Sequence, residues 1–181
     1  MKKSISLLFL FISCFSVAQE KWTTQSGTIN FEASVPLFEE VSAQNHSVKC
    51  VLNTEEKTIT CVVKIKDFNF KRDLMRTHFN EIYMESDRYP RAVFKGIISN
   101  LDTNKISSEG IVLPINGKIK IHGVTQNITV NALIKKMARS LQITTDFNLN
   151  TDDFKIEIPT MILPKISKTV HTHLNCTLQQ N

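Results

Sequence analysis

The chain has few of the features that mark a catalytic site in a sequence. It has only five glycines among its 181 residues, and it contains no Gly-x-Ser-x-Gly elbow, no phosphate-binding loop and no dinucleotide fingerprint. A Cys-x-x-Cys pair is also missing. These absences weigh against an enzyme and make a binding or structural role the first hypothesis.

The charge balance and the hydropathy pattern argue against two further classes of protein. The formal net charge is +5, two of the lysines lie in the first 18 residues, and the remaining lysines are scattered along the chain. Such a mild basic balance predicts no nucleic-acid partner. Beyond the N-terminus no apolar stretch approaches the roughly 20 residues of a transmembrane helix, so we expect no stable membrane span.

The N-terminus, MKKSISLLFLFISCFSVAQ, is typical of a secretory signal peptide. Two lysines precede an apolar run, and small residues occupy the positions before a cleavage site near Ala18-Gln19. We therefore expect residues 1–18 to be removed and residues 19–181 to form a single periplasmic or secreted domain. A lipoprotein acylated at Cys14 is the minority alternative, because a phenylalanine stands where leucine is usual.

Three cysteines remain in the mature chain: Cys50, Cys61 and Cys176. In SVKCVLNTEEKTITCVV a hairpin centred between Glu55 and Glu56 places Cys50 opposite Cys61. This pair is either a cross-strand disulfide or two buried thiols that act as small hydrophobes. We favour the thiols, because direct strand neighbours give strained disulfide geometry. The odd count means that at least one thiol stays free or pairs elsewhere.

Alternation of apolar and polar residues dominates the mature chain. A period of two is the pattern of half-buried strands, and short polar connections separate the runs. We expect eight strands and a weaker ninth, at residues 28–34, 46–52, 58–65, 91–99, 113–123, 127–136, 140–150, 168–178 and, for the weaker one, 154–159. About eight or nine such strands predict a mainly β fold, an antiparallel barrel or sandwich.

One segment breaks the alternation. Its apolar residues are spaced by four, three and one and make a single helical face: Met75, Phe79, Ile82 and Tyr83. Asp73 marks the start, and Tyr89-Pro90 enforces a stop because the residue before proline is pushed out of the helical region. We expect one helix over about residues 73–87, packed against an end or seam of the sheet.

Two groups of polar residues suggest chemistry. On a helical wheel His78, Glu81 and Glu85 gather beside the apolar face, where they fit either a metal or acid–base site or a rim ion pair. His171 and His173 share one face of a strand whose apolar residues take the other, so we expect both in solvent. In each case we favour the structural role and expect no metal and no catalytic residue.

Three segments follow one another in an order that is typical of a known family. In DFNFKRDLMRTHFNEIYMESDRYPRAVFKG a charged strand end leads into a Phe-containing helix, Tyr-Pro and a strand with Phe. In GKIKIHGVTQNITVNALI a strand ends in Ile-His-Gly-Val-Thr and the chain returns at once. FNLNTDDFKIEIP is a third, weaker element. Together, from about residue 27 to 178, they resemble the YceI-like family of polyisoprenoid-binding periplasmic proteins.

The chain departs from that family in three places. The usual arginine before the Asp-Phe element is Thr151 or Asp152 here, and the glycine after that phenylalanine is Lys155. The early Gly-x-Phe step is replaced by VSAQNHSVKC. These departures concern the pocket mouth and its ligand and leave the architecture intact.

The resemblance implies an elongated, lipocalin-like antiparallel barrel that holds a polyisoprenoid or quinone-like lipid in an apolar tunnel, as a carrier or store without a cofactor. The candidate lining residues come from inward strand positions and the helix face: Phe31, Phe70, Met75, Phe79, Tyr83, Phe94, Ile121, Phe147 and Phe154. The same residues also fit a core filled with side chains, so the alternative is a structural or partner-binding barrel without a ligand. The oligomeric state stays open, a dimer included.

Overall fold

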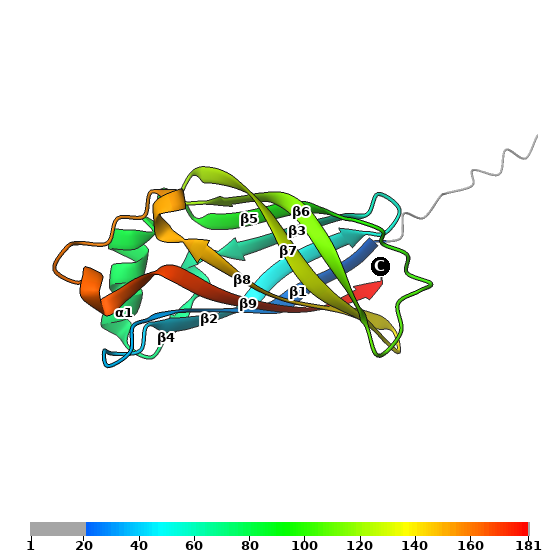
Figure 1. The fold of residues 1–181 in the computed structure, drawn as a ribbon, viewed down its shortest axis with the longest axis horizontal. Coiled ribbons are helices and arrows are strands. Elements are labelled where there is room, and N and C mark those ends of the chain that lie inside the picture. The colour runs from blue at the N-terminus through cyan, green and yellow to red at the C-terminus, as the bar shows by residue number, and fades with distance from the viewer. Residues whose placement is uncertain (1–20, 181) are drawn as a thin grey trace, which may run out of the picture.

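Nine strands build the protein in the computed structural model, which describes residues 21–180 (Figure 1). They are β1 (Lys21–Ser34), β2 (Ser42–Asn53), β3 (Thr58–Lys64), β4 (Asn69–Phe70), β5 (Arg91–Ile98), β6 (Ile111–Ile121), β7 (Val124–Met137), β8 (Ser140–Asn150) and β9 (Ile166–Gln180). The helical elements are η1 (Ile65–Asp67), α1 (Asp73–His78), η2 (Phe79–Tyr83), η3 (Thr151–Phe154) and η4 (Leu163–Lys165). The predicted signal peptide, its cleavage site and Cys14 lie outside the described residues.

The strands pair in antiparallel fashion, and the sheet closes on itself. The order is β1-β9-β8-β7-β6-β5-β3-β2, and β1 pairs again with β2 to complete a barrel. The two-residue β4 extends the sheet beside β2, where Phe70 lies opposite Ala43. The prediction of a mainly β, antiparallel barrel of eight or nine strands is confirmed.

Cys50 and Cys61 form a disulfide within the β2–β3 hairpin. The two residues lie directly opposite each other, as the hairpin prediction requires. The preference for two free thiols was wrong. The Cα atoms are 4.2 Å apart, which is the short spacing of a non-hydrogen-bonded antiparallel pair and brings the two side chains together.

The ninth strand predicted at residues 154–159 does not form. Thr151–Phe154 make the 3₁₀ turn η3, and Lys155 follows with a φ of 55°. That left-handed conformation interrupts an extended chain. The carbonyl of Thr151 accepts a hydrogen bond from the amide of Ile156 at 3.1 Å, so the backbone turns across the barrel end instead of pairing with a strand. The extra strand of the sheet is β4.

The helix begins at Asp73, as predicted, but it ends at Tyr83, before the predicted stop. Glu85 adopts a φ of 41°, which a right-handed helix cannot contain. The chain therefore leaves the helix well before Pro90. No helix within residues 21–180 is long and apolar enough to cross a membrane.

The second half of the helix is a π-helix, and this changes which side chains face inward. The amide of Met84 donates to the carbonyl of Phe79, five residues back, at 2.9 Å. A wider turn rotates the following residues relative to a 3.6-residue wheel. Met75, Phe79 and Tyr83 still face the barrel, whereas Ile82, predicted on the same face, is 53% exposed.

The two ends of the barrel are packed differently. At the end away from α1 the interior is filled with apolar side chains that are at most 1% exposed, among them Val48, Cys50, Leu52, Ile98, Ile134, Leu141, Cys176 and Leu178. Leu101 and Ile106, in the β5–β6 connection, are buried beside them. At the other end lie α1, the β1–β2 loop and the β8–β9 connection (Figure 1). The space beneath these segments is hollow.

Candidate ligand-binding cavity

A cavity of about 490 Å³ occupies the α1 half of the barrel. This volume is in the range of ligand pockets, roughly 300–1,000 Å³, and the lining is predominantly aliphatic and aromatic. The structure places all nine residues predicted from the sequence on this lining: Phe31, Phe70, Met75, Phe79, Tyr83, Phe94, Ile121, Phe147 and Phe154. That they contact a ligand stays a prediction.

Four phenylalanine rings form one wall of the cavity. Phe31 stacks on Phe79 with 5.5 Å between ring centroids, and Phe70 lies 5.0 Å from Phe79. Phe68 meets Phe31 edge-on at 5.3 Å. These separations are those of favourable aromatic pairs. Because the rings come from β1, the η1–β4 segment and η2, the cluster fastens the helical cover to the barrel.

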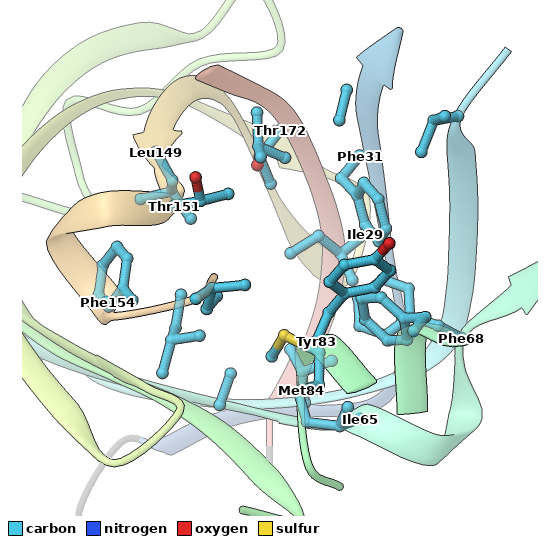
Figure 2. A pocket seen from close by; sticks show the side chains of 18 of the residues that line it. Ile29, Phe31, Ile65, Phe68, Tyr83, Met84, Leu149, Thr151, Phe154 and Thr172 are labelled. Atoms are coloured by element: carbon cyan, nitrogen blue, oxygen red, sulfur yellow. The ribbon is translucent and has the colours of Figure 1, made fainter. Parts of the chain in front are cut away.

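The helical cover also supplies a polar group. Tyr83 and Met84, at the end of η2, lie across the open space from Leu149 and Thr151 (Figure 2). Burial raises the pKa of the Tyr83 phenol. A tyrosine hydroxyl is protonated at neutral pH even without this shift and can donate a hydrogen bond.

The opposite wall, at the β8–η3 junction, carries a hydroxyl without a partner. Thr151 is 9% exposed and lines the cavity, and no group among the described residues bonds its Oγ1. A buried hydroxyl without a hydrogen bond costs about 1–3 kcal/mol. The Thr151 side chain lines the cavity while its hydroxyl oxygen is buried behind that lining, and a rotation about χ1 would turn the hydroxyl toward the otherwise apolar chamber.

Charged lining residues gather at the open end of the cavity. Glu39 Oε1 and Arg72 Nε form an ion pair at 2.7 Å, with side chains 47% and 67% exposed. His78 and Lys165 are exposed as well. Among the lining residues of the described chain, no charged side chain is buried. The interior thus favours uncharged groups, since transferring an unpaired charge into it would be costly.

Apolar side chains surround the same opening on the outside. Leu37 and Phe38 lie on the β1–β2 loop, Leu74 on α1 and Met161 before η4, and all are exposed. These three segments meet at one end of the barrel (Figure 1). The mouth therefore joins an apolar exterior rim to an apolar interior.

Sequence reasoning missed several lining residues. Phe68 and Met84 are buried on the lining, and Ile156, Ile158 and Ile162 cover it from the β8–β9 connection. The alternation of apolar and polar residues in FKIEIP marks Ile156 and Ile158 as inward-facing, although it also predicts a strand that does not form. The alternation identified inward side chains correctly, but it did not imply a pairing partner.

The polar cluster predicted on the helix does not assemble. Glu85 Oε2 lies 2.9 Å from His122 Nε2 in the β6–β7 turn, and His122 Nδ1 lies 3.2 Å from the carbonyl of Phe154. Glu85 lies beyond the end of η2 and pairs with His122. No group of three or more metal-binding side chains occurs within residues 21–180. Glu85 and His122 instead tie three segments together at the barrel end.

His171 and His173 lie on the outer face of β9, as expected, while Thr172 between them is buried. Each histidine contacts a polar side chain of β8. His171 Nδ1 is 2.7 Å from Asn148 Oδ1, and His173 Nδ1 is 2.7 Å from Asp146 Oδ1. These contacts are cross-strand pairs on the surface of the sheet.

The family follows from a comparison with known sequences. Residues 16–178 match the model of the YceI-like domain. The chain belongs to the YceI-like family. No curated protein matches it.

Solved structures share the YceI-like barrel at low sequence identity. A polyisoprenoid binding domain from Saccharophagus degradans, implicated in plant cell wall breakdown, has a TM-score of 0.78 and 13% identity over 90% of this chain and 99% of its own. Burkholderia cenocepacia BcnA has a TM-score of 0.68 and 10% sequence identity, over 83% of this chain and 95% of its own. A Campylobacter jejuni YCEI protein has a TM-score of 0.59 and 16% sequence identity, over 75% of this chain and 80% of its own. At these identities the likeness concerns the fold.

One departure of this YceI-like chain can now be explained physically. Lys155, which stands where the family commonly has glycine, has a φ of 55°. Glycine adopts this left-handed conformation without a steric penalty, and lysine adopts it at some cost. Lys155 therefore occupies a backbone conformation that a glycine would adopt more readily.

Proposed function

We propose that this YceI-like protein is a non-enzymatic carrier or store of a long, uncharged isoprenoid chain, a polyisoprenoid or quinone-like lipid, in the periplasm or outside the cell. The observation that carries the proposal is the hollow half-barrel, whose lining is predominantly apolar and carries charge only at its mouth. The polyisoprenoid-binding description of a structure with the same fold supports it. The signal-like residues 1–18 and the Cys50–Cys61 disulfide support the location.

The energetics of such a site are sufficient without a charged anchor. Burial of apolar carbon contributes about 0.8 kcal/mol per methylene, so each five-carbon isoprene unit contributes roughly 3–4 kcal/mol before costs. Ordering a flexible chain and the association itself cost several kcal/mol. A few buried units therefore give useful affinity.

The head group of the ligand should be neutral. Thr151 and Tyr83 line the cavity on opposite sides, and the hydroxyl that each carries suits a ligand hydroxyl or quinone carbonyl. A charged group would have to remain at the mouth beside Arg72 and Lys165. The apolar rim there, with Leu37 and Met161 exposed, provides a path for an apolar chain to enter and leave.

The test is to purify the protein from its native source, extract it with organic solvent and identify the extracted lipid by mass spectrometry. We expect a neutral prenyl lipid at close to one molecule per chain. A clean extract, together with no uptake of added polyprenol or ubiquinone-type lipid, would count decisively against the proposal. It would favour the structural or partner-binding alternative.

A further inference from the structure

Three cysteines meet where the filled half of the barrel borders the cavity. Cys50 on β2 is bonded to Cys61 on β3, and the free thiol of Cys176 on β9 lies with its Sγ 3.5 Å from the Sγ of Cys50. All three side chains are buried, with exposures of 0%, 6% and 1%. One sulfur, that of Cys50, therefore has both a bonded and a non-bonded cysteine neighbour.

This contact is unusual because β1 lies between β9 and β2 in the sheet. The β1 pairing with both neighbours shifts register near Gly27, where a bulge interrupts the regular ladder. A Cβ atom at Gly27 would lie 2.5 Å from Cys176 Sγ. The absent side chain thus provides the space in which the thiol reaches across β1 to Cys50.

We propose that Cys50 is shared between two alternative disulfides and that Cys176 exchanges into the bond now held by Cys61. The Cys176 thiol loses its proton and attacks Cys50 Sγ, a Cys50–Cys176 bond forms, and the Cys50–Cys61 bond breaks. Cys61 leaves as a thiolate and takes up a proton. The step conserves one disulfide and one thiol, so no external oxidant or reductant is needed.

The exchange moves the free thiol to a different part of the molecule. Cys61 lines the ligand cavity, whereas Cys176 does not. The exchanged form would present a reactive thiol on the cavity lining, a modification site for electrophilic lipids. It would also replace a link between residues 11 apart by one between residues 126 apart, which fastens β9 to β2.

The native environment makes this exchange slow at neutral pH. Burial raises the pKa of the Cys176 thiol to about 12, and only the thiolate attacks a disulfide. The Cys50–Cys61 form therefore persists at neutral pH, and exchange accelerates as the pH rises or as the strands open locally.

The decisive variant is Cys61→Ser, which removes the native partner of Cys50. After incubation of the folded protein with oxidised glutathione, we expect no free thiol in denaturant and a Cys50–Cys176 linked peptide on mass spectrometric mapping. The matched control, Cys50→Ser, should keep both remaining cysteines free. Two free thiols in folded Cys61→Ser would overturn the proposal, and Cys61→Val replaces it should the serine variant not fold.

A second measurement uses the unmodified protein. N-ethylmaleimide, small enough to enter the cavity, is added to the native protein at pH 9, and the labelled cysteine is mapped over time. We expect the label to accumulate on Cys61, while Cys176→Ser, which holds no thiol to start the exchange, stays unlabelled. Label confined to Cys176 would contradict the exchange. Neither experiment depends on a lipid being bound.

Discussion

A tryptophan placed inside the hollow half-barrel should block a long ligand without unfolding the protein. Ala92 on β5 faces inward beside Val63 of β3 and lines the cavity. The side chain of an Ala92→Trp variant has open space to occupy, so the overpacking cost of about 1–3 kcal/mol seen in filled cores should be largely avoided. Lys95→Trp, exposed on the same strand, is the matched control.

The expected loss of affinity follows from the chain length displaced. An indole that takes the place of one isoprene unit removes up to roughly 3–4 kcal/mol of apolar burial, which corresponds to about a hundredfold to several hundredfold in Kd at 1.4 kcal/mol per factor of ten. A two-unit prenol, which can settle elsewhere in the cavity, should lose much less than a long polyprenol.

The assay is a titration with prenols of increasing length, followed by displacement of a fluorescent polyprenyl probe, with thermal unfolding measured in parallel. The reasoning is refuted if stable Ala92→Trp binds the long polyprenol as tightly as the unmodified protein. It is also refuted if Lys95→Trp loses affinity to the same extent.

Three further predictions concern single sites. Thr151→Val should leave binding of a prenyl hydrocarbon unchanged and weaken that of the matching prenol up to about tenfold, the value of one net hydrogen bond; calorimetry that finds equal effects on both contradicts this role. Gly96→Ala should reduce the affinity for long chains, because the added Cβ would lie 2.7 Å from the ring of Phe94 and push that ring into the cavity. A crystal structure of the variant with the Phe94 ring unmoved argues against this prediction. In a Cys50→Ala/Cys61→Ala background, which prevents exchange, burial should hold the pKa of the Cys176 thiol at about 12 in the folded protein. In the unfolded protein the thiol should return to its ordinary pKa of 9.0. The free energy of unfolding should therefore fall by about 1.4 kcal/mol per pH unit from pH 9 to 12, and urea denaturation that shows the same slope after Cys176→Ala excludes this contribution.

The candidate site was predictable where local geometry decides the direction of a side chain. Phe31, Phe94 and Phe147 lie at inward positions of alternating strands, and the pleat alone puts them on the inner face. The same rule places His171 outside. The helical wheel placed Ile82 on the inward face wrongly, because the π-helix changes the rotation per residue. The spacing of apolar residues does not reveal a π-helix.

Contacts between distant segments were not predictable in this way. Glu85 leaves the helix early and meets His122, 37 residues away, and the sequence near Glu85 gives no sign of that partner. Cys176 reaches Cys50 only because Gly27 of an intervening strand lacks a side chain. Such contacts depend on which strands become neighbours and on their register.

The sequence by itself therefore determined eight of the strands, their inward faces, the start of the helix and the family. Only the tertiary structure decided that one half of the barrel is filled and the other hollow, that the hydroxyl of Thr151 has no hydrogen-bond partner within residues 21–180, and that three cysteines meet. The physical reason is that alternation is a property of each strand alone. Whether inward side chains meet across a barrel depends on its diameter and strand tilt, which all the strands set together.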